Sequence, residues 1–184
     1  MTGGTDPASR SPRGGRVGAA RLLCLLLVAA LLGAAVTWWA GRHWTRVEVV
    51  SASMSPTLRV GERAWVDTRY AGGRGVAAGD VVVFRDPGGF TDHPGSLVTK
   101  RVIALGGQSL SCCDGSGALL RDGRRLDEPY LPAGVVPSGL AFDVTVPAGS
   151  LWLMGDNRPA SLDSRQAGPV PATAVLGRIR SAGR

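Results

Sequence analysis

The chain has 184 residues and a formal net charge of +7, so its length allows one domain with an appendage. Its 27 glycines and 12 prolines argue against long soluble helices and favour many short strands and turns. The arginines are spread along the chain, and no basic run is interleaved with aromatic residues. The charge therefore does not indicate a nucleic-acid-binding protein, and we expect no nucleic-acid partner.

Residues 1–21 form a basic segment rich in Gly, Ser, Pro and Arg, which we expect to be a disordered tail because it cannot bury a core. Residues 22–40 then run without a charge, and a helix of that length spans the roughly 30 Å core of a bilayer. Because the arginines precede this span, the positive-inside rule places residues 1–21 in the cytoplasm and residues 41–184 outside it. The sequence predicts a single-pass anchor in the cytoplasmic membrane.

Two other interpretations of residues 22–40 fit less well. The run is longer than the apolar region of about 7–15 residues in a cleaved signal peptide, and Trp38 and Trp39 crowd the zone where cleavage would fall. A buried soluble helix would need a polar face, which the segment lacks. Together with Trp44, these tryptophans instead resemble an interfacial belt. We therefore expect an uncleaved anchor in contact with membrane lipid.

After the anchor the pattern becomes that of β-strands. Apolar, often β-branched runs are separated by turns rich in Gly, Asp and Pro. Residues 119–126 predict a hairpin, because Asp122-Gly123 favours a type I′ turn. The expected fold is mainly β, an antiparallel β-rich domain from about residue 45 to the end of the chain. The predicted strands are 47–50, 64–66, 81–84, 97–105, 119–121, 124–126, 144–146, 151–154 and 174–179.

The stretch Ser51-Ala52-Ser53-Met54-Ser55-Pro56-Thr57-Leu58 places three serine hydroxyls directly after a predicted strand. A turn of small residues at the end of a strand holds side chains at a fixed, exposed point, as a nucleophile requires. A serine nucleophile also needs a base within hydrogen-bond reach and a group that orients this base. The stretch is therefore a candidate only if the chain supplies both.

Histidine and lysine are the candidate bases. A Ser-His-Asp triad through His93 is one alternative, although nothing in its polar loop fixes its position, and His43 adjoins the anchor. Lys100 lies in the apolar strand 97–105, where alternation places it and Arg101 on opposite faces, so one of the two cations must point toward the apolar side. Burial lowers the pKa of a lysine and makes its neutral amine a competent general base. The competing interpretation is that both cations pair with acids or reach solvent.

The segment 155–165 is dense in hydrogen-bonding side chains, so it either covers a site or forms an ordinary polar surface loop. Five features of the chain, taken in order, resemble the bacterial type I signal peptidases. They are the anchor, the serine stretch, Gly79-Asp80-Val81-Val82-Val83-Phe84, Lys100-Arg101-Val102-Ile103 and segment 155–165. These are membrane-anchored Ser-Lys endopeptidases that remove signal peptides. The resemblance covers the chain from residue 22 onward.

The resemblance implies a role for each matched residue. Ser53, which directly precedes Met, matches the nucleophile, and Lys100, which directly precedes Arg, matches the general base. The Ser51 hydroxyl and the Ser53 backbone N–H match the oxyanion hole, and Ser161 matches the residue that orients the lysine. Structural support is expected from Asp156, Asp163 and Arg165, the last two as an ion pair.

The resemblance also implies the substrate class. We expect exported preproteins, bound as an extended strand with small residues at the first and third positions before the cut. Val49, Val50 and Val98 are the expected walls of the pockets. No metal or cofactor is expected, because the clusters of His, Cys and acidic residues that a zinc site needs are missing from the sequence.

Two segments depart from the family pattern. Pro159-Ala160 stands where polar residues are frequent, and Ala104-Leu105-Gly106-Gly107-Gln108 stands where Gly-Leu-Pro-Gly-Asp is common. Neither departure removes a catalytic group, so both bear on loop conformation alone.

Cys112 and Cys113 are adjacent in the sequence, with α-carbons only about 3.8 Å apart across a trans peptide. A disulfide between them would be strained, so two free thiols and a strained bridge both stay open.

Three other classes of protein compete with this interpretation. Self-cleaving Ser-Lys repressors are soluble, which conflicts with the predicted span. A sortase needs a cysteine in a reactive context with His and Arg, and the sequence offers none. A membrane-anchored β domain that binds exported peptides without cutting them stays open, because it would keep the same fold and groove.

Overall fold

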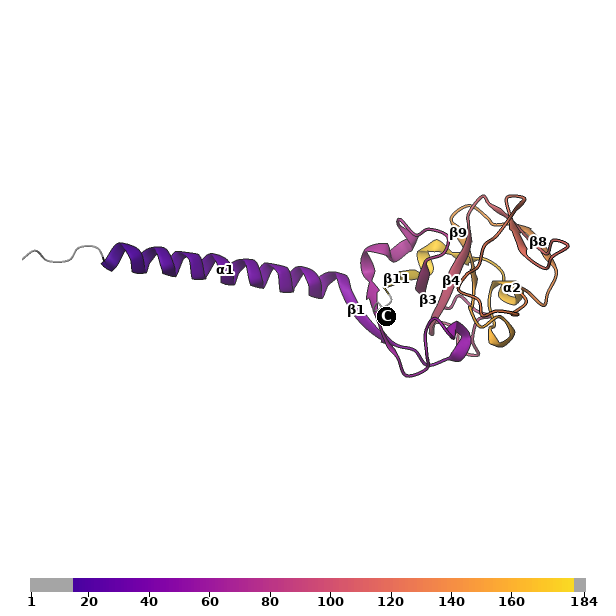
Figure 1. The fold of residues 1–184 in the computed structure, drawn as a ribbon, viewed down its shortest axis with the longest axis horizontal. Helices are drawn as coiled ribbons and strands as arrows, with labels where there is room; N and C mark the ends of the chain where they lie inside the picture. Colours follow the sequence, from indigo (N-terminus) through magenta and orange to yellow (C-terminus); the bar gives the residue numbers. More distant parts are fainter. Residues whose placement is uncertain (1–14, 181–184) are drawn as a thin grey trace, which may run out of the picture. The chain divides into compact units, whose positions relative to one another are not determined.

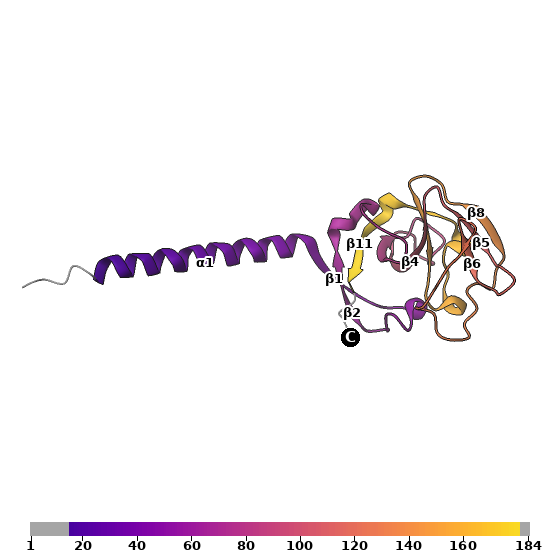
Figure 2. The ribbon, with the colours of Figure 1, turned by 45° about the horizontal axis from the view of Figure 1, so that its top comes forward.

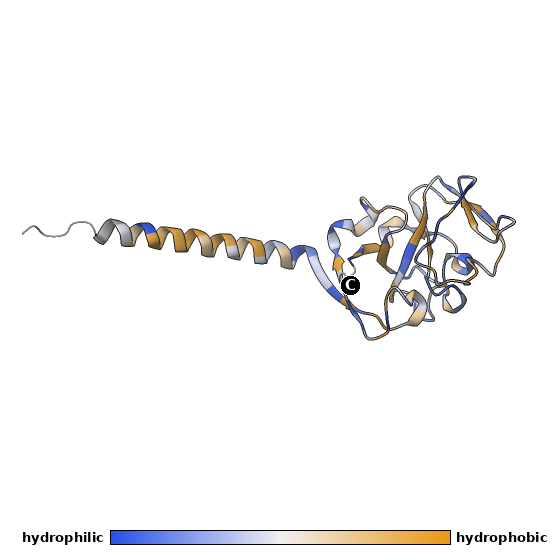
Figure 3. Cartoon of the chain, in the orientation of Figure 1, coloured by the Kyte–Doolittle hydropathy of each residue, from blue (hydrophilic) through white to orange (hydrophobic). Residues whose placement is uncertain are grey.

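The computed structural model describes residues 15–180. The chain divides into two units, one ending at Arg42 and the other beginning at His43, and each is described by itself. The first unit is formed by helix α1 (Gly15–His43), most of which is coloured as hydrophobic in Figure 3. Its segment Gly18–His43 is long and apolar enough to cross a membrane. The helix thus extends beyond the predicted span 22–40 at both ends, and the first 14 residues of the predicted tail lie outside the described residues.

In the described residues, eleven strands form two antiparallel sheets, which confirms a mainly β domain (Figure 1). The strands are β1 (Trp44–Glu48), β2 (Arg63–Asp67), β3 (Val81–Arg85), β4 (Leu97–Leu105), β5 (Ser109–Cys112), β6 (Leu119–Arg121), β7 (Arg124–Arg125), β8 (Phe142–Thr145), β9 (Ser150–Met154), β10 (Val170–Pro171) and β11 (Val175–Arg180). The larger sheet has the order β1-β2-β11-β3-β4-β9-β10, and the smaller has the order β7-β6-β5-β8. Figure 2 shows β5, β6 and β8 of the smaller sheet side by side.

Strands β3 and β4 lie in the interior of the larger sheet. The residues 81–84 are all buried, as predicted for a continuous apolar strand with both faces covered. Strand β4 has the bounds that the sequence predicts, and its register places Lys100 opposite Val82 and Val98 opposite Phe84. Lys100 is therefore held at mid-strand by its pairing with β3, one residue before the pairing of β4 with β9 begins at Arg101.

Three clusters of buried apolar side chains form the core of the domain. Phe84 and Phe90 meet edge to face in the first cluster, with ring centroids 5.1 Å apart. Met54, only 1% exposed, belongs to the second cluster, so the residue after Ser53 fixes the serine turn by packing. Trp152 belongs to the third cluster, which also contains Leu110 of the smaller sheet.

The predicted hairpin at residues 119–126 is confirmed. Asp122 and Gly123 have φ values of 53° and 72°, and Arg121 pairs with Arg124 across the two-residue loop. A type I′ turn requires a positive φ at both central residues, and Asp and Gly tolerate it. Local turn chemistry was therefore enough to specify this connection.

Other boundaries differ from the predicted ones. Strand β1 pairs with β2 from Trp44 to Glu48, so Val49 and Val50 follow the strand instead of ending it. Strands β5 and β10 are absent from the predicted set, and β10 consists of only two residues paired with β9. Cys112 and Cys113, at the end of β5, form a disulfide.

Candidate active site

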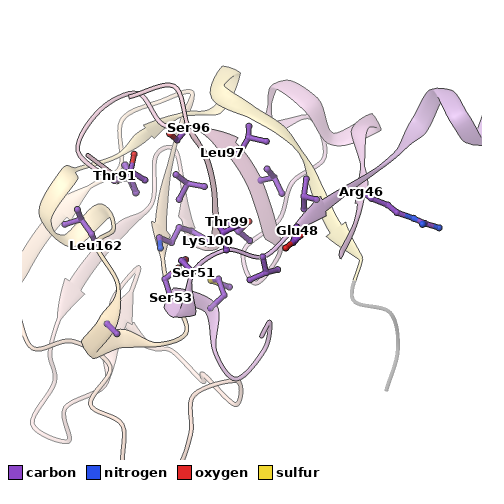
Figure 4. Close-up of a pocket in the computed structure, with 18 residues that line it drawn as sticks. Arg46, Glu48, Ser51, Ser53, Thr91, Ser96, Leu97, Thr99, Lys100 and Leu162 are labelled. Carbon is purple, nitrogen blue, oxygen red and sulfur yellow. Dashed lines mark hydrogen bonds between the residues drawn. The ribbon is translucent and has the colours of Figure 1, made fainter. Parts of the chain in front are cut away.

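A cleft of about 720 Å³ lies between the segment 46–54 and the first half of β4 (Figure 4). Most of its lining is apolar, and Ser51, Ser53 and Lys100 are among its polar residues. Figure 4 shows these three residues gathered in one part of the cleft. The structure thus brings together the predicted nucleophile, base and oxyanion-hole residue.

Ser53 lies in a short 3-10 turn, η1 (Ala52–Met54), and is 8% exposed. The Ser51 and Ser53 hydroxyl oxygens are 3.1 Å apart. Asn157 holds the turn from the other side, because its backbone N–H donates to the Ser53 carbonyl at 3.0 Å and its Nδ2 donates to the Ala52 carbonyl at 3.1 Å. The turn is therefore fixed by hydrogen bonds from a loop about a hundred residues away in the chain.

Lys100 is the only lysine in the sequence, beside 20 arginines. Its side chain is 3% exposed, and burial lowers the pKa of its amine to about 8, against opposing effects of Asp163 and Asp156. Within the described residues its amine makes no hydrogen bond to Ser53 or Ser161. Hydrogen bonds in an unliganded catalytic site are often long and tighten when the substrate binds.

Ser161 supplies a buried hydroxyl that makes no well-formed hydrogen bond among the described residues, although it lies close enough to Asp163 to help lower the pKa of that carboxyl. Gly155 lies directly against it, and a Cβ added at this glycine would overlap the Ser161 hydroxyl and the Ser53 carbonyl oxygen. The glycine is therefore required for this approach. A buried hydroxyl whose hydrogen-bonding capacity is not fully used is costly, so Ser161 is a candidate partner for a group that comes close during function.

Asp163 and Arg165 form an ion pair, with Arg165 Nε 2.8 Å from Asp163 Oδ1. Asp163 also caps the short helix α2 (Ser164–Ala167) in a capping box with Gln166, and it accepts the Gly155 N–H at 3.0 Å. Burial acts to raise the pKa of Asp163, but the hydrogen bonds from Arg165 and Gly155 outweigh it and lower that pKa. The aspartate thus ties the loop of Ser161 to the end of β9.

Arg101 is a member of the site that the analysis of the sequence did not assign. Its Nε and Nη2 donate to the two carboxylate oxygens of Asp156 at 2.8 and 2.6 Å, and Thr57 donates to the same carboxylate at 2.5 Å. This pair joins β4, the serine turn and the loop after β9. The sequence gives little indication of this role, because it shows Arg101 only as the residue that follows Lys100 in an apolar strand. Both cations of β4 are buried, and of the two only Arg101 pairs with an acid among the described residues.

The predicted pocket walls all line the cleft, although they differ in exposure. Val49 and Val98 are each 7% exposed and belong to core clusters, whereas Val50 is 79% exposed. His93 lies in an exposed loop and does not line the cleft. Of the two candidate bases, only Lys100 shares a cavity with Ser53. A hydroxyl in the same cleft as a buried amine of lowered pKa is suited to nucleophilic chemistry on a bound carbonyl group.

Several known proteins are similar to this chain. The signal peptidase I of Mycobacterium tuberculosis strain H37Rv is 36% identical over 183 aligned residues, which cover 72% of this chain and 62% of that protein. The signal peptidase I U of Bacillus subtilis is 34% identical over 132 residues, covering 67% and 66%. A solved signal peptidase I from Enterococcus faecalis is 28% identical and covers 58% of this chain and 98% of that one, with a TM-score of 0.49. The chain spans less than two thirds of the length of the two curated relatives.

A family match extends along most of the chain. The model of the family described as signal peptidase, peptidase S26, matches residues 19–182. This range includes the serine turn, Lys100 on β4 and the loop after β9. The likeness is therefore not confined to one motif, and the chain belongs to the signal peptidase family, peptidase S26.

Proposed function

We propose that this chain is a membrane-anchored serine endopeptidase of the signal peptidase I type, which removes signal peptides from exported preproteins. Membership in the peptidase S26 family and the similarity to proteins named signal peptidase I support the proposal. The observation that carries it is the position of Lys100, a buried lysine of lowered pKa, in the same cleft as Ser53 and Ser51. No cofactor takes part in the proposed reaction.

In the proposed reaction, Ser53 Oγ attacks the scissile carbonyl carbon while the neutral Lys100 amine takes the hydroxyl proton. The resulting oxyanion accepts hydrogen bonds from the Ser51 hydroxyl and the Ser53 N–H. The C–N bond then breaks, and Lys100 gives the proton to the leaving amine. Water attacks the acyl ester with Lys100 again as base, which releases the carboxylate and returns the proton to Ser53. Ser161 orients the amine throughout.

The walls of the cleft support the proposed substrate preference. Val49 and Val98 are largely buried in the core, so they leave shallow space for a side chain, and small residues fit at the first and third positions before the cut. The segment 46–50 and the first half of β4 both line the cleft, and an extended peptide lies between such segments by main-chain hydrogen bonding. An Ala-x-Ala sequence meets these conditions.

The proposed location is the outer face of the cytoplasmic membrane. The apolar segment Gly18–His43 is the anchor, and the arginines that precede it favour a cytoplasmic N-terminus. The domain from His43 onward then lies outside, where exported preproteins emerge. Contact with membrane lipid follows from the anchor.

Cleavage of a peptide with an Ala-x-Ala site, in detergent or lipid, tests the proposal. The wild type is expected to cut after the second Ala, and Ser53→Ala and Lys100→Met are each expected to lower the rate by at least about 10³-fold while circular dichroism stays unchanged. Cleavage that persists in Lys100→Met would assign the base to another group, such as His93. A wild type that binds the peptide in every lipid without cutting it would make the domain a peptide-binding module.

A further inference from the structure

The tripeptide Glu128-Pro129-Tyr130 lies in the irregular segment between β7 and β8. Its two polar side chains face inward. The Glu128 carboxylate receives Arg158 Nη2 at 2.5 Å and Nη1 at 3.3 Å, and the side chains of this pair are 6% and 1% exposed. The Tyr130 hydroxyl donates to the same carboxylate at 2.7 Å. The tripeptide is thus joined to the loop after β9.

Arg158 connects Glu128 to the backbone at the end of β9. Its Nε donates to the Gly155 carbonyl at 2.9 Å, and its Nη1 donates to the Pro137 carbonyl at 2.5 Å. Because the guanidinium is planar and rigid, a carboxylate that fixes two of its nitrogens also fixes the direction of the third. Glu128 therefore helps to fix the direction from which Arg158 donates to the Gly155 carbonyl.

Tyr130 reaches the next residue, Asp156, by a separate route. Its ring lies 3.9 Å from the Arg101 guanidinium carbon, and Arg101 donates to both oxygens of Asp156. Burial and the neighbouring Glu128 carboxylate raise the pKa of the Tyr130 phenol, so it stays a protonated donor. One tripeptide therefore holds two consecutive residues, Gly155 through Arg158 and Asp156 through Arg101.

The turn Gly155-Asp156 lies against Ser53 of the proposed catalytic dyad and acts on Lys100 through the charge of Asp156. Gly155 lies against the Ser53 carbonyl and the Ser161 hydroxyl, and the following Asn157 donates its N–H to the Ser53 carbonyl at 3.0 Å. Asp156 is also one of the charges that act on the Lys100 amine. A displacement of this turn would move the serine turn, loosen the packing around Ser161 and let water approach Lys100.

We infer that Glu128 and Tyr130 are positioning residues for the reaction of Ser53 and Lys100, acting through Arg158 and Arg101 on the turn Gly155-Asp156. This inference rests on the proposed function. Neither side chain lines the cleft, so neither touches substrate. A buried ion pair such as Glu128–Arg158 is poor evidence for stability, since apolar residues often replace such pairs without loss, whereas its directed hydrogen bonds specify geometry.

The charge state of Lys100 reports this positioning without any assay of cleavage. Because Lys100 is the only lysine, growth on ¹³C-labelled lysine gives one labelled side chain, whose Cε resonance follows the ionisation of its amine. The charged groups that act on this amine are Asp163, Asp156 and Arg165. Tyr130→Leu changes none of these charges, and we expect it to move the titration midpoint up from about 8 by about one pH unit, as water reaches the amine.

Glu128→Gln is a second informative variant, because the direction in which it shifts the pKa of Lys100 separates two causes. The loss of a negative charge alone would lower the pKa of Lys100, whereas a loosened turn raises it, so an upward shift identifies loosening. For both variants we expect kcat at pH 7.5 to fall about tenfold or more with KM unchanged, because the walls of the cleft stay in place. If Tyr130→Leu does not fold, Tyr130→Phe keeps the ring on Arg101 and loses only the hydroxyl bond, so a smaller upward shift is expected.

The chain contains a matched control for Tyr130→Leu. The Tyr70 ring lies 3.9 Å from the guanidinium carbon of Arg178, which pairs with Asp80, and neither Tyr70 nor Arg178 lines the cleft. Tyr70→Leu removes the same kind of stack and is expected to leave the Lys100 midpoint at its wild-type value. Equal midpoints in the wild type, Tyr130→Leu and Glu128→Gln would overturn the inference. A wild type that does not cleave would overturn the proposed function instead, and the resonance would still report the positioning.

Discussion

The Arg101 guanidinium donates to both oxygens of the Asp156 carboxylate, 55 positions away, and so ties the strand of Lys100 to the loop that follows β9. The aspartate is fully buried, and the arginine side chain is 11% exposed. Neither residue lines the cleft. Arg101 directly follows Lys100, which does line it, and Asp156 directly follows Gly155, which lies against the Ser53 carbonyl. The pair therefore links the folding of the domain to the geometry of the site.

Arg101→Met is expected to lower the free energy of unfolding by about 3–5 kcal/mol, because the Asp156 charge stays buried without its partner. Urea denaturation of the detergent-solubilised protein measures the loss. The double variant Arg101→Met/Asp156→Leu removes both charges and is expected to recover most of it. A double variant as unstable as Arg101→Met would show that packing against Tyr130, and not the ion pair, is what the domain needs.

The stability of the domain is expected to depend on pH through Lys100. Its pKa is about 8 in the folded protein and 10.5 for an ordinary lysine, so the unfolded chain binds more protons between these values. The contribution of Lys100 to stability therefore rises with pH across this window and is least favourable below pH 8. Lys100→Met is expected to be more stable than the wild type by about 3 kcal/mol at pH 7 and by little above pH 10.5.

Denaturation of both proteins at pH 7 and at pH 10 measures this difference. Lys100→Met retains a side chain of similar length, so cavity formation does not complicate the comparison. A difference that stays constant between the two pH values would show that the amine is not desolvated in the folded protein.

Local patterns in the sequence were sufficient to predict a structure where that structure depends on a single segment of the chain. The apolar, β-branched run of β4 predicts its bounds from Leu97 to Leu105, and Asp122-Gly123 predicts its turn. Strand alternation also predicted correctly that one cation of β4 points toward the apolar interior. It could not show that both are buried, because this depends on Asp156, which the fold brings to Arg101 from a distant part of the chain.

The positioning residues could not be predicted for the same reason. Glu128 and Arg158 are 30 positions apart, and nothing in the composition of either segment indicates that they meet. Strand β10 has two residues and exists only through its pairing with β9. Where an element or contact depends on residues distant in sequence, the local sequence pattern does not indicate it. The resemblance to a family supplied roles only for residues inside the matched motifs.

Gly155→Ala is expected to lower both activity and stability, because the added methyl group would overlap the Ser53 carbonyl and the Ser161 hydroxyl. Overpacking of this kind costs about 1–3 kcal/mol and displaces the groups that it meets. Gly115→Ala is the control, since nothing lies within 4 Å of its added Cβ and its φ is not positive. Thermal unfolding and peptide cleavage measure both variants. Full activity in Gly155→Ala would mean that the contact with Ser161 has no part in the reaction.

Ser51→Ala is expected to lower kcat by about 10²–10³-fold, the usual effect of removing one oxyanion donor. Ser51 is exposed, so unfolding should stay within about 0.5 kcal/mol of the wild type, and KM should change little because the donor acts on charge that develops in the transition state.

The pH midpoint of the Ser51→Ala rate should remain at about 8, since the Lys100 amine keeps its surroundings. Ser51→Thr retains the hydroxyl and is expected to recover much of the rate. Steady-state cleavage of the Ala-x-Ala peptide from pH 6 to 10 separates these outcomes. A midpoint that moves with Ser51→Ala would assign the Ser51 hydroxyl, 3.1 Å from Ser53 Oγ, to proton transfer and not to the oxyanion.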